Sequence, residues 1–514
     1  MPFRSILFER APGVSETDAQ EREAPPFFVD LNLDQIFASV AAGREEYDLA
    51  PFFRMPLREV NAITYRHEIL RDLEGAALRE HVQAFAQDMR GMREYLAHAA
   101  KLYYEHQKAS WFLAAVELYC IAVSRLAEVL SRADVKSRGF VAFRDYLANY
   151  VSSDSFRSLV AETKQRKDEL SKVAYCIYIR GKRVTVTRYA GEPDYSVEVE
   201  ETFRKFQQGA AMNYRVAFPN PLEMSHVEAG VLDQVARLYP DVFLALREYC
   251  DRHRDYLDET ICRFDREVQF YLAYLEFIAG LKAAGLHFCY PQVSDQSKEV
   301  YAYEAFDLAL ASKLVRERAT VVGNDFYLEG PERILVVSGP NQGGKTTFAR
   351  MFGQLHYLAS LGYPVPGRAA RLFLCDRLFT HFEREERIEN LRGKLQDELV
   401  RIHEILQEAT RGSIIIMNES FASTTLNDAL HLGREVLQQI IIQRGMLCVY
   451  VTFIDELSTL SEATVSMVST VDPDNPLRRT YKVVRRPADG LAYAAALATE
   501  YGLTYESVKR RIVR

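Results

Sequence analysis

Apolar residues recur at three- and four-residue steps over much of residues 27–153, most clearly over 82–104 and 111–130. That spacing places the apolar side chains on one face of a helix. We therefore expect a helical core domain over residues 27–153. Residues 1–26 are polar and contain Pro and Glu, and we expect them to form a poorly ordered N-terminal lead-in.

The pattern changes to an alternation of apolar and polar residues after Lys172. Two short alternating runs meet at Gly181 and Lys182, which predicts two strands joined by a turn within a small insertion over residues 154–222. The turn is basic, and its cations are Arg180, Lys182, Arg183 and Arg188. A helical pattern returns over residues 223–295, where residues 258–285 are long enough to form a strut of several turns.

Strands alternate with helices from residue 296 to residue 514. Three short apolar runs, ILVVSG, SIIIMN and MLCVYVTF, are typical of strands that are buried on both faces of a sheet. An alternation of such strands with helices predicts an α/β domain.

Composition narrows the class of protein. A chain of 514 residues exceeds what one hydrophobic core usually holds, so several domains are expected. The net charge of -7 means that any contact with nucleic acid must use local basic patches. The seven cysteines form no C-x-x-C pair, which argues against a zinc site or a disulfide framework. We see no signal peptide and no transmembrane run, and we expect a cytoplasmic protein.

Residues 339–346, GPNQGGKT, fit the pattern G-x-x-x-x-G-K-[ST] and lie between a predicted strand and a predicted helix. Glycines let such a loop turn its N–H groups toward phosphates, a lysine neutralises the phosphate oxygens, and a hydroxyl binds Mg²⁺. ATP and Mg²⁺ are therefore the expected cofactors. The predicted nucleotide site consists of Gly339, Pro340, Asn341, Gln342, Gly343, Gly344, Lys345, Thr346 and Thr347.

A second element of a P-loop ATPase is a buried strand that ends in two acidic residues. Here the strand 414–417 ends in Asn418 and Glu419. Asn418 can hydrogen-bond a metal-bound water but carries no charge, so we expect Thr346 and Asn418 at the metal, and Lys345 and Glu419 as the catalytic residues. The expected fold is multidomain: a helical core and lever region with a small β-containing insertion, followed by a C-terminal α/β P-loop domain.

Several segments resemble the MutS mismatch-repair family, and they occur in that family's order. GPNQGGKTT is similar to its P-loop, and residues 418–425, NESFASTT, lie where it carries D-E-x-x-x-G-T-[ST]. Residues 56–74, GYPVPGRAARL and YGLTYESVKRRI also match. The resemblance implies an ABC-type ATPase, a homodimer formed through the ATPase domains, and double-stranded DNA as a partner. It also implies that the segment VVGND, with Val321 and Val322, packs against the nucleotide base.

The departures from the family pattern predict slow ATP hydrolysis. Asn418 stands in place of the metal-site aspartate, and residues 420–423 replace a glycine-rich turn. Phe453 lies near the position of a family histidine, and Gly393 lies near that of a serine that contacts the partner's nucleotide. The sequence contains no F-x-E motif, so we expect no mismatch-reading domain, and we expect neither a connector nor a nuclease domain.

In the family, long helices carry a clamp that touches the DNA backbone, and residues 173–189 lie where such a clamp is inserted. The resemblance thus implies that Arg180, Lys182, Arg183 and Arg188 contact phosphates. The alternative is a solvated hairpin, because acidic residues follow closely and weaken the positive field.

The leading hypothesis for function is an ATP-gated dimeric clamp on distorted, mismatched, looped or branched DNA, acting in repair or recombination. The alternative is a nucleotide-dependent protein scaffold that has lost DNA binding. A transporter or a chromosome-organising ATPase has less support, because the sequence shows no transmembrane segment and no long heptad arms.

Overall fold

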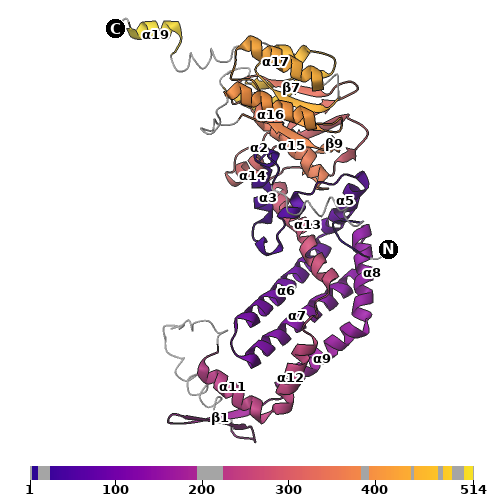
Figure 1. The fold of residues 1–514 in the computed structure, drawn as a ribbon, viewed down its shortest axis with the longest axis vertical. Coiled ribbons are helices and arrows are strands. Elements are labelled where there is room, and N and C mark those ends of the chain that lie inside the picture. Colours follow the sequence, from indigo (N-terminus) through magenta and orange to yellow (C-terminus); the bar gives the residue numbers. More distant parts are fainter. Residues whose placement is uncertain are drawn as a thin grey trace. The chain divides into compact units, whose positions relative to one another are not determined.

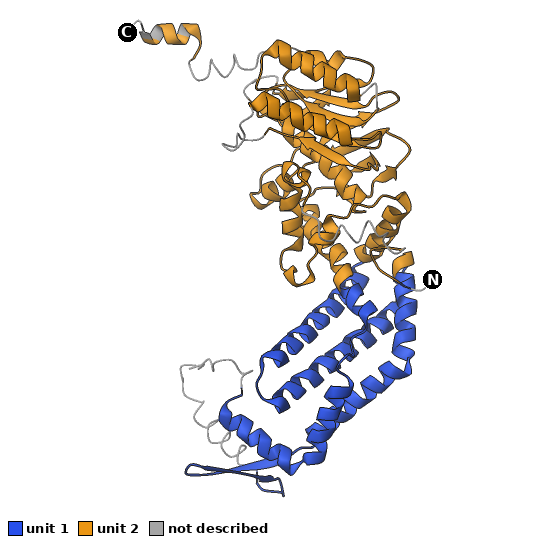
Figure 2. Ribbon diagram, in the orientation of Figure 1, with its two compact units in different colours: residues 1–3, 75–135, 140–265 blue, residues 4–74, 136–139, 266–514 orange. Residues whose placement is uncertain are grey.

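The computed structural model describes residues 3–9, 24–193, 224–383, 393–440, 445–472, 478–488 and 503–512 (Figure 1). The chain divides into two compact units, drawn in different colours in Figure 2. One comprises residues 1–3, 75–135 and 140–265, and the other comprises residues 4–74, 136–139 and 266–514. The bounds of the five domains predicted from the sequence are not tested by this division and remain predictions.

The first unit is helical, as the sequence pattern predicts. The long helices α6 (Ala76–Lys101) and α7 (Glu105–Arg132) pack along each other, and each buries one face. The other helices that the structure describes in this unit are α8 (Arg138–Ser152), α9 (Asp154–Ser171), α11 (His226–Leu238), α12 (Pro240–Arg252) and the start of α13 (Glu259–Ala283). Helix α9 extends the helical pattern to Ser171, into the segment predicted to form the insertion.

The predicted pair of strands is confirmed as a hairpin in the first unit. Strand β1 (Tyr175–Arg180) pairs antiparallel with β2 (Arg183–Arg188), and Arg180 lies opposite Arg183. Gly181 at the turn has a φ of 59°, a left-handed conformation that glycine adopts without steric cost. Ile177, Ile179 and Val184, which share one face, are all exposed.

The second unit begins with residues that are not the poorly ordered lead-in expected from the sequence. Ser5 donates a hydrogen bond from its hydroxyl to the Glu267 carboxylate at 2.8 Å, and Ile6 donates from its backbone N–H to the same oxygen at 2.9 Å. Ile6 and Leu7 are buried. The expectation was wrong for residues 5–7, because the buried side chains of Ile6 and Leu7 and the hydrogen bonds to Glu267 anchor them, while residues 10–23 lie outside the described residues.

Short helices and a longer one follow in the second unit: α2 (Phe27–Asp30), α3 (Leu33–Ala41), α4 (Ala50–Phe53) and α5 (Val60–Glu74). No helix among the described residues is long and apolar enough to cross a membrane.

The α/β part of this unit contains a six-stranded sheet in the order β10-β11-β12-β7-β13-β14. The first five strands are parallel, and β14 is antiparallel to β13. The strands are β7 (Ile334–Ser338), β10 (Leu378–His381), β11 (Ile414–Asn418), β12 (Leu447–Val451), β13 (Thr464–Val471) and β14 (Arg479–Arg485). The three predicted strands of this domain are β7, β11 and β12, and they lie side by side at its centre.

A second sheet of four strands has the order β4-β9-β5-β6, and β3 (Phe288–Cys289) pairs separately with β8 (Val365–Pro366). Its strands are β4 (Gln292–Ser294), β5 (Val300–Ala305), β6 (Asn324–Leu328) and β9 (Ala369–Phe373). Among the described residues of this part, the helices are α14 (Leu308–Arg316), α15 (Lys345–Ser360), α16 (Lys394–Glu408), α17 (Leu426–Gln438) and α19 (Tyr505–Ile512).

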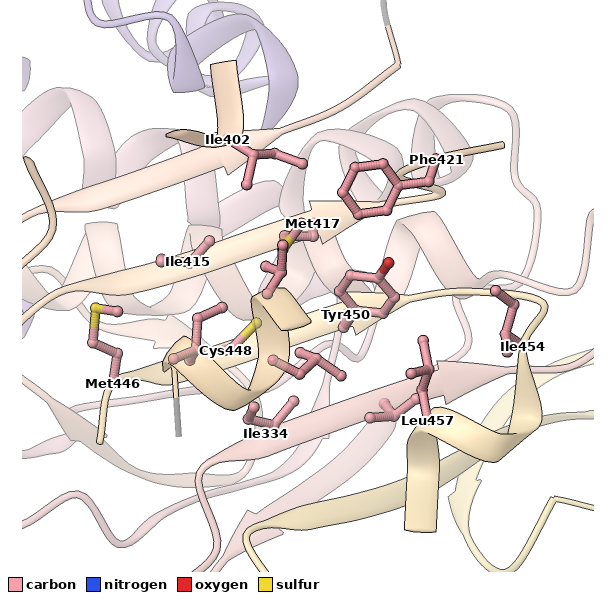
Figure 3. Close-up of a cluster of buried hydrophobic side chains, with 14 of the residues drawn as sticks. Ile334, Ile402, Ile415, Met417, Phe421, Met446, Cys448, Tyr450, Ile454 and Leu457 are labelled. Atoms are coloured by element: carbon pink, nitrogen blue, oxygen red, sulfur yellow. The ribbon is translucent and has the colours of Figure 1, made fainter. Parts of the chain in front are cut away.

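The central strands β7, β11 and β12 are buried along their whole length, which explains why they read as continuous apolar runs. On one face, Ile415 and Met417 of β11 join Ile402 of α16 and residues of α17 in one hydrophobic cluster (Figure 3). On the other face, a Cβ added to Gly353 of α15 would lie 2.6 Å from Ile416. Helix α15 therefore approaches the sheet closely, and nearly all of its side chains are buried.

We expect Gly367→Ala to destabilise the protein by roughly 1–3 kcal/mol. Gly367 has a φ of 135°, and an added Cβ would lie 3.0 Å from the Tyr303 carbonyl oxygen, a backbone atom that cannot move aside. The midpoint of urea unfolding measures the effect. Gly280→Ala is the matched control, because that helical glycine has open space around it and alanine favours helix. A Gly367→Ala midpoint at or above that of the wild type would contradict the steric argument.

Candidate nucleotide-binding site

The loop of residues 339–346 connects β7 to α15 and turns sharply at two glycines. Gly339 has a φ of 117° and Gly344 a φ of 94°, values that side-chain-bearing residues rarely adopt. Gly343 is required for a different reason, since an added Cβ would lie 2.3 Å from the Ser469 hydroxyl. The three glycines of the motif are thus required by backbone conformation or by close packing.

Lys345 begins α15, and its side chain folds back into the loop. Its ammonium donates to the carbonyl oxygens of Gly339 at 3.0 Å and Pro340 at 3.3 Å, and to the side-chain oxygen of Asn341 at 3.2 Å. Burial lowers the pKa of Lys345, and the nearby Glu419 carboxylate opposes that shift. A cation held in a buried loop at a helix N-terminus attracts phosphate more strongly than an exposed lysine does.

Thr346 and Asn418 meet across the site. The Thr346 hydroxyl donates to Asn418 Oδ1 at 2.9 Å, so the loop and the end of β11 present their oxygens together. Among the described residues, no group of three His, Cys, Asp or Glu side chains could hold a metal. These two oxygens nevertheless fit Mg²⁺ on a nucleotide, because that ion commonly takes few protein ligands and completes its shell with phosphates and waters.

Glu419 lies in a strained turn at the end of β11. Its φ is 53° and that of Phe421 is 65°, and each such conformation costs a non-glycine residue about 1–3 kcal/mol. The Glu419 N–H donates to the Val451 carbonyl at the end of β12 at 2.9 Å. The Glu419 carboxylate lies 3.9 Å from the Lys345 ammonium and is about one-third exposed. The predicted base is therefore beside the loop and open to solvent.

Sequence reasoning missed a group of contacts from β13 and β14. The Ser469 hydroxyl donates to the Gly343 carbonyl at 2.6 Å, and Arg479 Nε donates to the Asn341 carbonyl at 3.3 Å. No motif marks either residue, because the contacts join positions more than 120 residues apart in the chain.

The segment with Val321 and Val322 leads into Asn324, which bonds β14 beside the loop. Asn324 donates from Nδ2 to the Tyr481 carbonyl at 3.2 Å and accepts from the Val483 N–H at 2.8 Å. Both valines are half-buried. Tyr481 of β14 also lies next to Gly344, so β14 contacts both the loop and the segment of Asn324. The contact of the two valines with a nucleotide base remains a prediction.

The four candidate DNA-binding cations lie on the hairpin of the first unit, and they do not share one environment. Arg180, Lys182 and Arg183 are exposed around the turn. Arg188 instead donates to the Leu238 carbonyl and lies over the Tyr239 ring at 4.8 Å, so it anchors the hairpin to α11. Two of the residues that depart from the family pattern lie outside the hairpin: Phe453 is exposed, and Gly393 is the N-cap residue of α16.

Residues 335–500 match the family model for MutS domain V. A DNA mismatch repair protein MutS from Clostridium kluyveri is 25% identical over 305 residues, which cover 58% of this chain and 34% of that relative. MutS of Erythrobacter litoralis is 29% identical over 46% of this chain and 28% of its own length. MutS of Oleidesulfovibrio alaskensis is 31% identical over 28% of this chain and 16% of its own length. The chain thus matches about a third or less of each relative.

The parallel sheet, the glycine loop and the Thr346–Asn418 pair define the class of this domain as a P-loop nucleotide-binding ATPase. Its match to MutS domain V, an ABC-type ATPase domain, specifies it further. Residues 335–500 therefore form a domain of the MutS domain V family.

We expect Ser469→Ala to weaken the binding of Mg·ATP by about three- to tenfold, the loss that follows from one hydrogen bond of about 1 kcal/mol. Without the Ser469 hydroxyl, the Gly343 carbonyl loses its donor and the loop is held less firmly. Titration calorimetry measures the change. Ser466→Ala on the same strand is the control, because among the described residues its hydroxyl has no hydrogen-bond partner. Equal affinities for the two variants would contradict a role of Ser469 in holding the loop.

Proposed function

We propose that this protein is an ATP-gated dimeric clamp that binds distorted, mismatched, looped or branched double-stranded DNA and acts in repair or recombination in the cytoplasm. The observation that carries the proposal is the meeting of Lys345, Thr346, Asn418 and Glu419 at one edge of a sheet that matches MutS domain V. The relatives bear the name DNA mismatch repair protein, which supports DNA as the partner.

Each residue of the site has a distinct part in the proposed reaction. The loop N–H groups and Lys345 would hold the phosphates, and Thr346 and Asn418 would hold Mg²⁺ or its waters. Glu419 would accept the proton of a water molecule, for which its carboxylate, about one-third exposed, is suited. Cleavage of the phosphoanhydride bond of ATP would return the clamp to its nucleotide-free form. In this proposal ATP also tightens a homodimer formed through the ATPase domains.

The proposed DNA contact rests on the hairpin. Arg180, Lys182 and Arg183 surround its tip, and cations in that position fit the phosphate backbone of a duplex without reading its sequence. Arg188 contributes indirectly in this scheme, because it fixes the base of the hairpin through Leu238.

A second candidate function is a nucleotide-dependent protein scaffold. One observation favours it: Ile177, Ile179 and Val184 leave an apolar face of the hairpin exposed, and exposed apolar patches often mark protein contacts. Salt dependence separates the two candidates, since phosphate contacts release counterions and apolar contacts do not.

We expect Lys182→Ala combined with Arg183→Ala to weaken binding to four-way or looped DNA. The slope of log affinity against log salt should fall by about two, because two phosphate contacts are lost. Fluorescence anisotropy over a salt series, with and without ATP, measures both quantities. Lys313→Ala combined with Arg316→Ala on α14 removes the same charge from exposed positions of the other unit and should change neither. DNA affinity that does not depend on salt in the wild type would favour the scaffold.

Hydrolysis by the wild type should be slow, and we expect Asn418→Asp to raise its rate by about tenfold by restoring a negative charge at the metal. Glu419→Ala should lower the rate by at least about a hundredfold, since general-base catalysis contributes that much. Release of phosphate at saturating Mg·ATP measures the three rates. Lys345→Ala should bind ATP far more weakly and serves as the control for the site. A rate for Glu419→Ala equal to that of the wild type would place the base elsewhere.

A further inference from the structure

The turn of residues 419–421 is held by two side chains that no sequence motif marks. Glu398 of α16 accepts a hydrogen bond from the Phe421 N–H at 3.0 Å. His381, the last residue of β10, shares a hydrogen bond between Nδ1 and the Ser420 hydroxyl at 2.8 Å. Glu398, His381 and Ser420 are all buried. Two elements on separate stretches of the chain therefore hold the three-residue turn that carries Glu419.

Helix α16 holds this turn in two ways. Glu398 and Ile402 are four residues apart and so share one face of the helix. Ile402 packs in the same buried cluster as the Phe421 ring, and Figure 3 shows both side chains directed into it. The ring anchors the turn through apolar contact, while the Glu398 carboxylate satisfies the N–H of the same residue. Burial raises the pKa of Glu398, and the Phe421 N–H opposes that shift.

The turn of residues 419–421 is strained, and the contacts from Glu398 and His381 hold it in that strained conformation. Glu419 and Phe421 both have left-handed φ values, and Ser420 lies between them. A turn of non-glycine residues reverts to ordinary conformations unless its surroundings hold it. Any such relaxation rotates the Glu419 carboxylate away from its place 3.9 Å from the Lys345 ammonium.

We propose that Glu398 and His381 are positioning residues that hold the Glu419 carboxylate at the P-loop by fixing the turn of residues 419–421. The inference rests on the proposed function of Glu419 as the base. Because the two residues bond the turn at Ser420 and Phe421, we expect them to act on the rate of hydrolysis and not on the affinity for nucleotide. A misplacement of a catalytic group by about 1 Å can cost about a hundredfold in rate.

The test is the rate of phosphate release against ATP concentration for a set of variants. Glu398→Ala should lower kcat about ten- to a hundredfold and leave KM within about threefold of the wild type. Glu398→Gln keeps an oxygen that accepts the Phe421 N–H and should restore kcat to within about threefold. Glu404→Ala, an exposed glutamate on the same helix, is the control and should match the wild type.

His381 gives a second, independent pair of variants if Glu398→Ala fails to fold. His381→Asn keeps a polar group that can bond the Ser420 hydroxyl and should retain most of the rate. His381→Leu removes that bond and should lower kcat with KM unchanged. A fall in kcat with an equal loss of ATP affinity in either series would overturn the proposal, because it would show general damage to the site.

A double-mutant cycle separates this proposal from the function on which it rests. Adding Glu398→Ala to Glu419→Ala should cause no further loss, since Glu398 acts through Glu419. A further loss of the same size as in the single variant would overturn the positioning role. If Glu419→Ala hydrolyses ATP at the wild-type rate, the assigned base itself is wrong. If Glu419→Ala is inactive but Glu398→Ala and His381→Leu keep the wild-type kcat, only the positioning proposal fails.

Discussion

The parallel register of three adjacent strands is the constraint on which the site depends. Asn418 of β11 lies opposite Val451 of β12, and Val451 lies opposite Val337 of β7, two residues before the loop. Because parallel strands end at the same edge, this register brings the end of β11 level with the start of the glycine loop. The 2.9 Å contact between Thr346 and Asn418 follows from that alignment, although the two residues are 72 positions apart. A shift of one residue in β11 would turn its side chains to the opposite face.

Helix α15, which begins at the P-loop, is held in the interior of the unit by hydrogen bonds of a buried side-chain amide. The helix carries Gln354 into the interior, where its amide donates to the Leu31 carbonyl and to Asp307, both at 2.9 Å, and accepts from the Leu308 N–H at 2.7 Å. Burial raises the pKa of Asp307. A buried amide with its bonds satisfied fixes the orientation of the helix, whereas the same group without partners would destabilise it. The P-loop is thereby tied to α2 and α14 in addition to the sheet.

The sequence was sufficient to predict the elements whose signal is local. The glycine loop, the three central strands, the helical pattern and the hairpin each depend on residues close together in the chain, and the structure contains all of them. Contacts from distant segments could not be predicted in this way. Ser469, Glu398 and His381 are ordinary residues of a strand or helix until folding brings them to Gly343, Phe421 and Ser420. Residues 5–7 were misjudged for the same reason, since their partners include Glu267.

In the proposed function, Asn418 separates the binding of a nucleotide from its hydrolysis. The bonds of Lys345 run to the carbonyls of Gly339 and Pro340 and to Asn341, and none depends on a charge at position 418. The loss of an aspartate makes the site less negative, which favours an anionic nucleotide while weakening the hold on its metal. The amide oxygen still accepts the Thr346 hydroxyl, so the geometry of the edge is kept without the charge. In the proposed clamp, such a site would favour a long-lived nucleotide-bound state, and the lifetime of that state would determine how long the clamp keeps one conformation.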